Sequence, residues 1–331
     1  MTSAEQERRF APAPPCLLVN PRSFRAARGL ADRAIALAAE RGAEVVRVEV
    51  GADLSAALDA ILARRQRHVA VLAGDGTVRE VIERLSQLPP GHWLPELLIL
   101  PGGRTNLTAA DLVPRADPLA TLAKALAWAG DGRWDSGVVE RVPLCIAQAP
   151  ASPRFGFFFG GGAVDSIVRR AQDHRYGGSG PLRSGHLSSP WVVTKIAALA
   201  LVGRADIPVP TLAIDAGALG SLRGRIRLVM ATTLLHRTGL FDPYAARGQG
   251  ELRLTAVAAA ARRFWPALPR LLTGRYSKAM NLDNGYLSGN CERVQITGLA
   301  GYVLDGERFD NDPARPVVVT PGRRLRFFSC P

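Results

Sequence analysis

The sequence predicts two domains: an α/β domain built on a parallel sheet, and a second, mostly antiparallel β-rich domain. At 331 residues the chain exceeds the usual size of a single hydrophobic core. Apolar segments of strand length alternate with helical segments up to about Trp134, and beyond it short strand-like segments separated by glycine-rich turns dominate. Charge also divides the chain: residues 1–150 carry a net charge of +1, and residues 151–331 a net charge of +12.

The first part has the pattern of repeated strand–helix units. The expected strands are Cys16–Asn20, Glu44–Val50, Val69–Ala73 and Leu97–Leu100. The expected helices are Arg25–Arg41, Leu54–Arg67, a segment with the apolar stripe Val78, Val81, Ile82 and Leu85, and Leu119–Trp128. Because strands that alternate with helices form right-handed βαβ units, these strands are expected to run parallel in one sheet.

The second part has the pattern of a β-rich domain with helical insertions. Its expected strands are Val138–Ala147, Phe155–Phe159, Leu212–Asp215, Arg225–Thr232, Glu251–Thr255, Arg293–Thr297 and Gly301–Leu304. Its expected helices are Val164–Gln172, Trp191–Val202 and about Ala256–Leu272. A β-hairpin is expected over Pro316–Phe328, packing back on the first domain. The predicted boundaries are residues 14–136 with 313–331 for the α/β domain, and residues 137–312 for the β-rich domain.

Composition excludes several classes of protein. No apolar run reaches the roughly 20 residues that span a bilayer, and the N-terminal segment lacks the apolar core of a secretory signal. The four cysteines lie far apart without CxxC spacing, which argues against a zinc site and fits a reducing, cytoplasmic location. The pI of about 10.6 suggests nucleic-acid binding, but the sequence contains no recognised nucleic-acid-binding module and no aromatic platform.

The sharpest motif is Gly74-Asp75-Gly76-Thr77, which follows a buried strand and opens an amphipathic helix. In this geometry the backbone N–H groups and the helix dipole receive phosphate. Asp75, as an anion, is better suited to Mg²⁺ or to ordering catalytic groups than to touching phosphate. An ordinary strand-to-helix turn with Asp75 as the N-cap explains this motif alone equally well.

Two further polar loops favour a nucleotide site over that simple turn. Leu100–Asn106, with its Pro-Gly-Gly-Arg-Thr-Asn sequence, follows the fourth expected strand, and Asn20–Ser23 follows the first. Parallel sheets bind ligands at the carboxyl ends of their strands, so all three loops should share one rim. The chain lacks the Gly-x4-Gly-Lys-Ser/Thr loop of P-loop ATPases, and Arg79 stands where a dinucleotide-binding Gly-x-Gly-x-x-Gly motif needs its third glycine.

These motifs resemble those of the diacylglycerol kinase catalytic-domain family, which includes bacterial lipid kinases and sphingosine and ceramide kinases. The family's Gly-Gly-Asp-Gly-Thr loop is similar to Ala73–Thr77, its Asn-Pro-x-Ser loop to Asn20–Ser23, and its Pro-x-Gly-Thr-x-Asn loop to Pro101–Asn106. A late Leu-Asp-Gly-Glu matches Leu304–Glu307. The four motifs occur in the family's order.

The resemblance implies an N-terminal nucleotide domain of NAD kinase-like fold and a C-terminal, β-sandwich-like lipid domain. It implies an enzyme that transfers the γ-phosphoryl group of Mg²⁺-ATP to the hydroxyl of a membrane lipid, either diacylglycerol or a sphingoid base or ceramide. The cofactors implied are ATP and Mg²⁺. The residues implied to contact the nucleotide are Asn20, Ser23, Gly74, Asp75, Gly76, Thr77, Glu80, Gly103, Arg104, Thr105 and Asn106. Asp75 would also hold the metal, and Glu307, supported by Asp305, would accept the hydroxyl proton.

The sequence departs from the family pattern at several positions. Phe24 replaces a glycine and could crowd the phosphate loop. Arg104 replaces a threonine that contacts the nucleotide, and either Arg104 adds a phosphate-binding cation or Thr105 supplies the lost contact. The family's Pro-x-Ala-x-x-Asp-Asp-Gly segment corresponds best to Asp242–Gly248, which lacks the paired aspartates and so puts an accessory metal site in doubt. Asp305-Gly306 is, taken alone, also the usual pair of a type I′ hairpin turn.

The charge asymmetry predicts a partner for the second half. Residues 154–278 hold 18 basic and 6 acidic side chains, which favours attraction to the anionic surface of the inner membrane leaflet. The Trp191–Val202 helix, which could equally be a core helix, and Arg262–Trp265 would supply interfacial elements. Two other functions stay open: a NAD kinase-like enzyme, and a catalytically weak protein that binds lipid or nucleotide.

Overall fold

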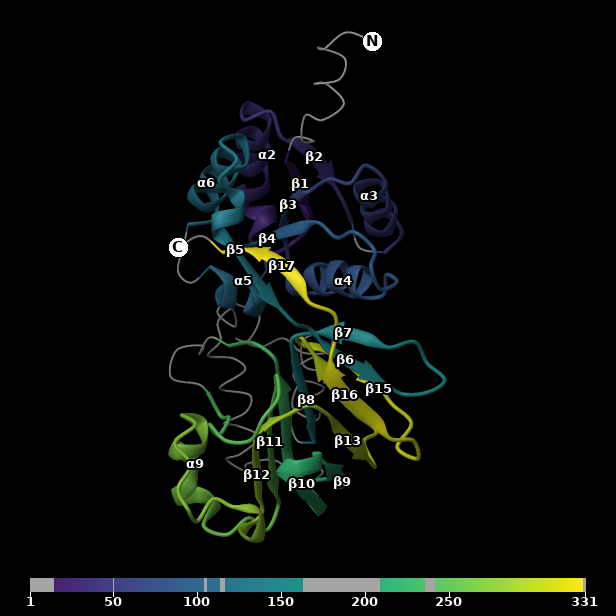
Figure 1. Cartoon of the computed structure of the whole chain (residues 1–331), viewed down its shortest axis with the longest axis vertical. Coiled ribbons are helices and arrows are strands. Elements are labelled where there is room, and N and C mark those ends of the chain that lie inside the picture. Colours follow the sequence, from purple (N-terminus) through teal and green to yellow (C-terminus); the bar gives the residue numbers. More distant parts are fainter. Residues whose placement is uncertain are drawn as a thin grey trace, which may run out of the picture. The chain divides into compact units, whose positions relative to one another are not determined.

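The chain folds into two units, which the computed structural model describes over residues 15–49, 51–103, 106–113, 117–162, 209–235 and 242–329. The first unit comprises Met1–Glu140 and Leu325–Pro331, and the second comprises Arg141–Arg324. Figure 1 shows their helices and strands.

The first unit is built on a six-stranded sheet in the order β2-β1-β3-β4-β17-β5. The strands are β1 (Cys16–Val19), β2 (Glu44–Arg47), β3 (His68–Ala73), β4 (Glu96–Pro101), β5 (Val138–Arg141) and β17 (Leu325–Phe328). The pairings of β1 with β2, β1 with β3, β3 with β4, and β4 with β17 are all parallel. Every residue of β1 and β3 is buried, which explains the apolar runs Cys16–Val19 and Val69–Ala73.

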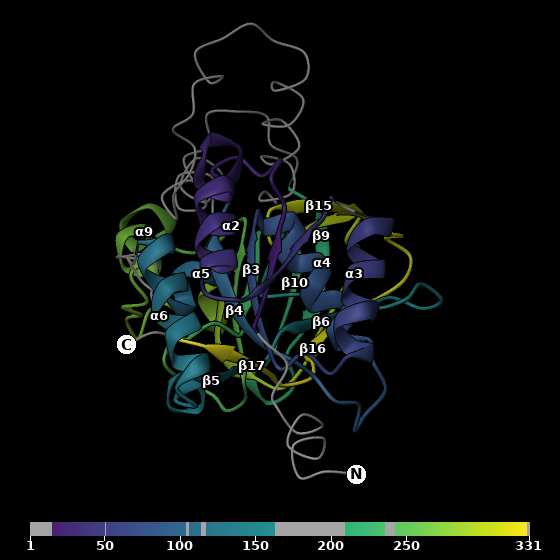
Figure 2. The ribbon, with the colours of Figure 1, turned by 90° about the horizontal axis from the view of Figure 1, so that it is seen from above.

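Helices cover both faces of this sheet (Figure 2). The helical segments are η1 (Ala26–Arg28), α2 (Leu30–Glu40), α3 (Ala52–Ala63), α4 (Asp75–Ser86), α5 (Leu107–Leu112), α6 (Pro118–Gly130) and η2 (Trp134–Gly137). Helices α2 and α6 pack together on one face, and α3 and α4 lie on the other. The buried stripe of α2 consists of Ala31, Ala34 and Ala38, whose small side chains allow close packing against the sheet.

The last two strands, β16 (Val317–Pro321) and β17, do not form the expected hairpin. Strand β16 pairs with β6 (Leu144–Ala147) in the second unit, whereas β17 lies between β4 and β5 in the first. The side chains explain the separation, because Val317 and Val319 are buried in the core of the second unit and Phe328 in the core of the first. The expected return of residues 313–331 is therefore limited to the segment from Leu325.

The second unit is a curled, almost entirely antiparallel sheet. Its main path is β15-β14-β8-β10-β9-β13-β16-β6-β7, and β11 and β12 extend from β10. Besides β6 and β16, its strands are β7 (Arg154–Gly156), β8 (Phe158–Gly162), β9 (Thr211–Asp215), β10 (Ser221–Thr232), β11 (Leu252–Ala258), β12 (Tyr286–Cys291), β13 (Val294–Thr297), β14 (Gly301–Leu304) and β15 (Glu307–Asp310). Its described helical segments are η4 (Gly217–Leu219), α9 (Phe264–Leu272) and η5 (Leu282–Asn284).

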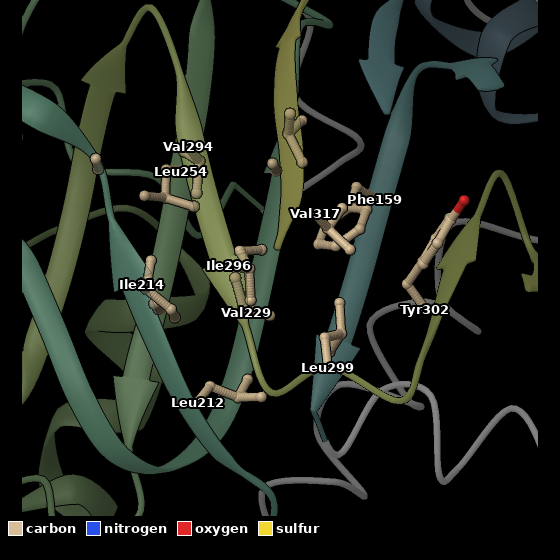
Figure 3. Packing of buried hydrophobic residues seen from close by; sticks show 14 of the residues in the cluster. Phe159, Leu212, Ile214, Val229, Leu254, Val294, Ile296, Leu299, Tyr302 and Val317 are labelled. Carbon is tan, nitrogen blue, oxygen red and sulfur yellow. The ribbon is translucent and has the colours of Figure 1, made fainter. Parts of the chain in front are cut away.

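Strand β10 joins the two layers of this unit. Its first half, Ser221–Arg225, pairs with β9, and its second half pairs with β8 and β11 after a register shift between Ile226 and Leu228. The core lies between the layers, where Ile214 and Ile296 of one pack near Val229 and Leu254 of the other (Figure 3). The predicted fold class, a parallel α/β domain followed by an antiparallel, sandwich-like β domain, is thus confirmed.

Two expected elements of the second part differ clearly from the structure, and two others lie outside the described residues. The strand expected over Val138–Ala147 is two strands, one in each unit, because Pro143 interrupts the run and offers no N–H for pairing. The helix expected over Ala256–Leu272 begins only at Phe264, because the pairing of β11 with β10 continues to Ala258. The helices expected over Val164–Gln172 and Trp191–Val202 lie outside the described residues. No helix within the described ranges combines the length and apolarity needed to cross a membrane.

A buried polar cluster lies at the edge where β3 and β4 begin. The buried Glu96 carboxylate accepts from Arg67 and pairs with Arg326 of β17, and the His68 ring stacks on Trp134 at a centroid distance of 4.4 Å. Burial, and then the positive charge of Arg67, lower the pKa of His68 to about 4. His68 is therefore neutral at pH 7, and its 3.9 Å approach to Glu96 is not an ion pair there.

We expect His68 to make the first unit sensitive to acid. The unfolded chain binds a proton at His68 below about pH 6.5, whereas the folded chain binds it only below about pH 4. His68 therefore does not lower the free energy of unfolding above about pH 6.5. As the pH falls from there towards 4, the free energy of unfolding decreases by about 3 kcal/mol in total, because the unfolded chain binds the proton first. The free energy of unfolding, measured in urea from pH 7 to pH 4, should fall less in His68→Phe than in the wild type. Equal falls would contradict this assignment.

We expect Phe328→Ala to destabilise the first unit by about 3–5 kcal/mol, because it empties a fully buried position in a central strand. The Phe328 ring contacts Trp134 and Trp128, at centroid distances of 4.4 and 5.7 Å. The measurement is urea unfolding followed by tryptophan fluorescence. Phe24→Ala, at a partly exposed phenylalanine of the same unit, serves as the control and should cost much less. A loss below 1 kcal/mol in Phe328→Ala would show that β17 is dispensable.

Candidate functional site

Three loops meet at the carboxyl edge of the parallel sheet, after β1, β3 and β4. Ser23 Oγ accepts a hydrogen bond from the Gly74 N–H at 2.9 Å, and the Arg25 N–H donates to the Gly102 carbonyl at 2.8 Å. The Asn106 N–H donates to Asp75 Oδ2 at 3.0 Å. The rim that the sequence predicted is thus a set of loops that hydrogen-bond to one another.

Two of the residues that resemblance implied as nucleotide contacts have buried side chains that bond to each other. Asn20 Nδ2 donates to Thr77 Oγ1 at 3.0 Å, and Asn20 Oδ1 accepts from the Arg22 N–H. These two side chains join the loop after β1 to the first turn of α4. They therefore fix the positions of two of the three rim loops relative to each other.

Glycines at 102 and 103 allow the backbones of two loops to touch. A Cβ at Gly103 would lie 2.7 Å from the Gly74 Cα, and a Cβ at Gly102 would lie 2.8 Å from the Ala73 backbone. Asn106 adopts φ 52° and ψ 43°, and its side-chain amide exchanges two hydrogen bonds with the backbone of Gly103. Any side chain at position 103 would push the loop after β4 away from Asp75, which accepts the Asn106 N–H of that loop.

The N-terminus of α4 points its first amides at this rim. Gly74 is the N-cap, and the first helical hydrogen bond runs from the Val78 N–H to the Gly74 carbonyl at 3.0 Å. The N–H groups of Gly76 and Thr77 precede that bond and so have no partner within the helix. Gly76 is exposed, and a Cβ built on it would contact nothing within 4 Å. This end of α4 has both the dipole and the open space that an anion requires.

Asp75 is the acidic residue of the rim. Its carboxylate is partly buried, and Oδ2 receives the Asn106 N–H. Within the described residues no group of three or more His, Cys, Asp or Glu side chains lies close enough to hold a metal ion. Mg²⁺ bound mainly by nucleotide phosphates and water needs only one or two protein carboxylates, so Asp75 fits that role.

The remaining predicted rim residues lie as follows. Glu80 Oε2 accepts from the Gly51 N–H at 3.4 Å, so it links α4 to the turn before α3. Arg104 and Thr105 lie outside the described residues. The Phe24 ring, which replaces the family's glycine, lies against the Arg28 guanidinium with 4.2 Å to its centroid.

In the second unit, Asp305 and Gly306 form the turn between β14 and β15. Their φ angles of 50° and 87° are those of a type I′ hairpin. The Asp305 carboxylate also accepts the N–H groups of Phe157 and Phe158, at 3.0 and 2.8 Å. Glu307, the first residue of β15, is exposed. Asp305 therefore anchors the turn to the start of β8, and the turn presents Glu307 to solvent.

One residue that supports this turn was not predicted. A Cβ at Gly156 would lie 2.6 Å from Asp305 Oδ2, so only glycine leaves room for the carboxylate to reach its amides. Gly156 is 149 positions from Asp305 and belongs to no recognised motif. No signal in the sequence connects it with the turn.

The segment that resemblance related to an accessory metal site has another role. Asp242 is buried and forms an ion pair with Arg253 of β11. Arg253 lies over the Tyr244 ring at 4.7 Å. The Asp242 carboxylate is thus paired with an arginine of the neighbouring strand.

Comparisons with known proteins agree with this architecture. Residues 14–133 match the sequence model of the family described as diacylglycerol kinase catalytic domain. No curated protein matches the chain significantly.

Solved structures cover nearly the whole chain. The crystal structure of a diacylglycerol kinase from Bacillus anthracis str. Sterne aligns with 14% identity and a TM-score of 0.63, over 96% of this chain and 97% of that chain. Two further Bacillus anthracis structures align with 15% and 14% identity and TM-scores of 0.64 and 0.66, each over 96% of this chain and 98% of theirs. At these identities the structures establish the fold.

The loop motifs, the family match and the shared fold agree. The resemblance of this chain to the diacylglycerol kinase catalytic-domain family is confirmed, and residues 14–133 carry the match.

Proposed function

We propose that this protein is an ATP-dependent lipid kinase, which transfers the γ-phosphoryl group of Mg²⁺-ATP to a hydroxyl of a membrane lipid. The observation that carries the proposal is the rim of three mutually bonded loops at the N-terminus of α4. The match to a diacylglycerol kinase catalytic domain supports a kinase. The acceptor class, diacylglycerol or a sphingoid base or ceramide, is part of the proposal.

Phosphate binding falls to backbone groups. The amides of Gly76 and Thr77 at the start of α4 attract the negative oxygens of the nucleotide, and the exposed Gly76 lets them approach. Ser23 and Asn106 hold the loops in place through their bonds to Gly74 and Gly103. Phosphoryl transfer depends mainly on such positioning and on charge neutralisation.

Asp75 is the residue that would hold Mg²⁺ beside the phosphates. The ion, when bound, neutralises charge that develops on the transferred phosphoryl group. The Asn106 N–H bond orients the Asp75 carboxylate.

Glu307 is the proposed base. The lipid hydroxyl oxygen bonds to the γ-phosphorus, the bond from that phosphorus to the β–γ bridging oxygen breaks, and the hydroxyl proton passes to the Glu307 carboxylate. The products are the lipid phosphate and ADP. Exposure of Glu307 on a hairpin that Asp305 fixes supports this role.

Loss of either carboxylate should strongly lower lipid phosphorylation. We expect Glu307→Gln, which removes the proposed base, and Asp75→Asn, which removes the charge that would hold Mg²⁺, each to lower kcat by at least about 100-fold. The measurement is transfer of label from [γ-³²P]ATP with Mg²⁺ to diacylglycerol, sphingosine or ceramide in separate micelles. Glu292→Gln, at an exposed glutamate of the same unit, is the control and should keep wild-type activity.

The same assay tests the other two functions. Label found in NAD instead of lipid would establish a NAD kinase-like enzyme. Absence of label from every acceptor, with lipid or nucleotide still bound, would leave a binding protein of the same fold.

We expect Gly156→Ala to lower activity without affecting the nucleotide site. The added methyl group would push against Asp305 and displace the turn that carries Glu307. A displacement of about 1 Å at a reacting group costs roughly 100-fold in rate. Steady-state kinetics should show a lower kcat and an unchanged KM for ATP. Gly130→Ala, where a Cβ meets nothing within 4 Å, is the matched control; an unchanged kcat in Gly156→Ala would contradict the role given to the turn.

A further inference from the structure

Helix α9 of the second unit exposes an aromatic side chain that the core does not use. Trp265 is 52% exposed, whereas its neighbour Phe264 and the more distant Leu271 are buried. Trp265 and Pro269 are four residues apart, as are Pro266 and Arg270, and all four are exposed. At helical spacing these residues form one continuous face, opposite the buried face of Phe264 and Leu271.

The start of α9 is fixed to the sheet, so Trp265 is presented on a rigid support. The Arg262 N–H donates to the Asn284 carbonyl at 2.9 Å, and the Arg262 carbonyl accepts from the Tyr286 hydroxyl at 2.9 Å. The Phe264 ring packs under the Arg227 guanidinium at 4.8 Å and meets the Trp265 ring edge-on at 5.3 Å. These contacts hold Trp265 outward.

The exposed tryptophan is surrounded in sequence by positive charge without acidic residues. Between Glu251 and Asp283 the chain has no aspartate or glutamate. Five exposed basic residues lie on or beside α9: Arg262, Arg263, Arg270, Arg275 and Lys278. No carboxylate of the described residues forms an ion pair with any of the five. We call these five residues, with Trp265, Pro266 and Pro269, the α9 surface.

We propose that the α9 surface docks on an anionic lipid bilayer. Tryptophan prefers the boundary between headgroups and acyl chains, and arginines around it pair with lipid phosphates. Pro269 has no N–H, so the helical hydrogen bond that residue 269 would donate to the carbonyl of Trp265 is missing. The inference rests on the proposed function, since a kinase whose acceptor lies in a bilayer must bind that bilayer.

The composition of the α9 surface favours a bilayer over a nucleic acid or a second protein. A site for single-stranded nucleic acid has several stacking aromatic groups along a basic groove, whereas here one exposed aromatic ring and two exposed prolines lie on a helix that basic residues flank in sequence. Charge complementarity selects anionic over neutral lipid.

The test is co-sedimentation of the full chain with vesicles of phosphatidylcholine alone and of phosphatidylcholine mixed with phosphatidylglycerol. We expect binding to the anionic vesicles that weakens with salt. Arg262→Gln/Arg263→Gln should weaken it roughly 30-fold, about fivefold for each basic residue removed from the surface. The control Arg41→Gln/Arg47→Gln removes the same charge from exposed positions of the first unit and should change binding less than twofold. Quenching of tryptophan fluorescence by brominated anionic lipid should be smaller in Trp265→Phe than in the wild type.

Several results would overturn the docking proposal. They are equal losses in the two double variants, equal binding to neutral and anionic vesicles, or quenching that Trp265→Phe leaves unchanged. Tighter binding to duplex DNA or RNA, lost in Arg262→Gln/Arg263→Gln, would assign the surface to nucleic acid instead.

Activity in neutral-detergent micelles separates this inference from the proposed function. The Arg262→Gln/Arg263→Gln variant should phosphorylate lipid there at the wild-type rate, because its residues lie outside the proposed site. Transfer without the expected vesicle binding would overturn docking alone. Vesicle binding without transfer by the wild type would overturn the kinase while docking stands.

Discussion

The rim of three loops depends on the contact between the loop after β3 and the loop after β4. A side chain at Gly103 would collide with the Gly74 Cα, so the absence of one lets the two backbones touch. This contact brings the Asn106 N–H to Asp75 and sets the first turn of α4 at the edge of the sheet. The Ser23 bond to Gly74 adds the loop after β1. The proposed phosphate chemistry requires that geometry, because backbone amides can bind an anion only where the loops keep them accessible.

In the second unit a carboxylate holds a turn in place. The Asp305 carboxylate accepts hydrogen bonds from the N–H groups of Phe157 and Phe158, and these bonds attach the hairpin turn to β8. The structure shows the turn, and the proposed role of Glu307 is compatible with it, although the sequence presents the two as alternatives. Asp305 secures a left-handed turn whose next extended residue is Glu307. A proton acceptor on a short, anchored turn keeps its position better than one on a long loop.

The fold and the local motifs could be predicted from sequence because both depend on short-range patterns. Unbroken apolar runs identify β1 and β3 as buried parallel strands, and the spacing of Val78, Val81, Ile82 and Leu85 identifies α4. The partners of Asn20 and Asp305 could not be predicted, because hydrogen bonds between residues 57 and 148 positions apart leave no local trace. The return of β17 to the first unit was predicted, but β16 was expected to return with it, and only the burial of Val317 and Val319 shows that β16 belongs to the second unit.

The place of β17 has a consequence for how the protein is made. Strand β17 lies between β4 and β5, yet it follows the whole second unit in the chain. During synthesis, β4 and β5 therefore leave the ribosome well before the strand that separates them in the sheet. The sheet of the first unit is therefore completed only after almost the whole second unit has been translated. The second unit needs β16, which ends just before β17 begins, so both units are completed at nearly the same point of the chain.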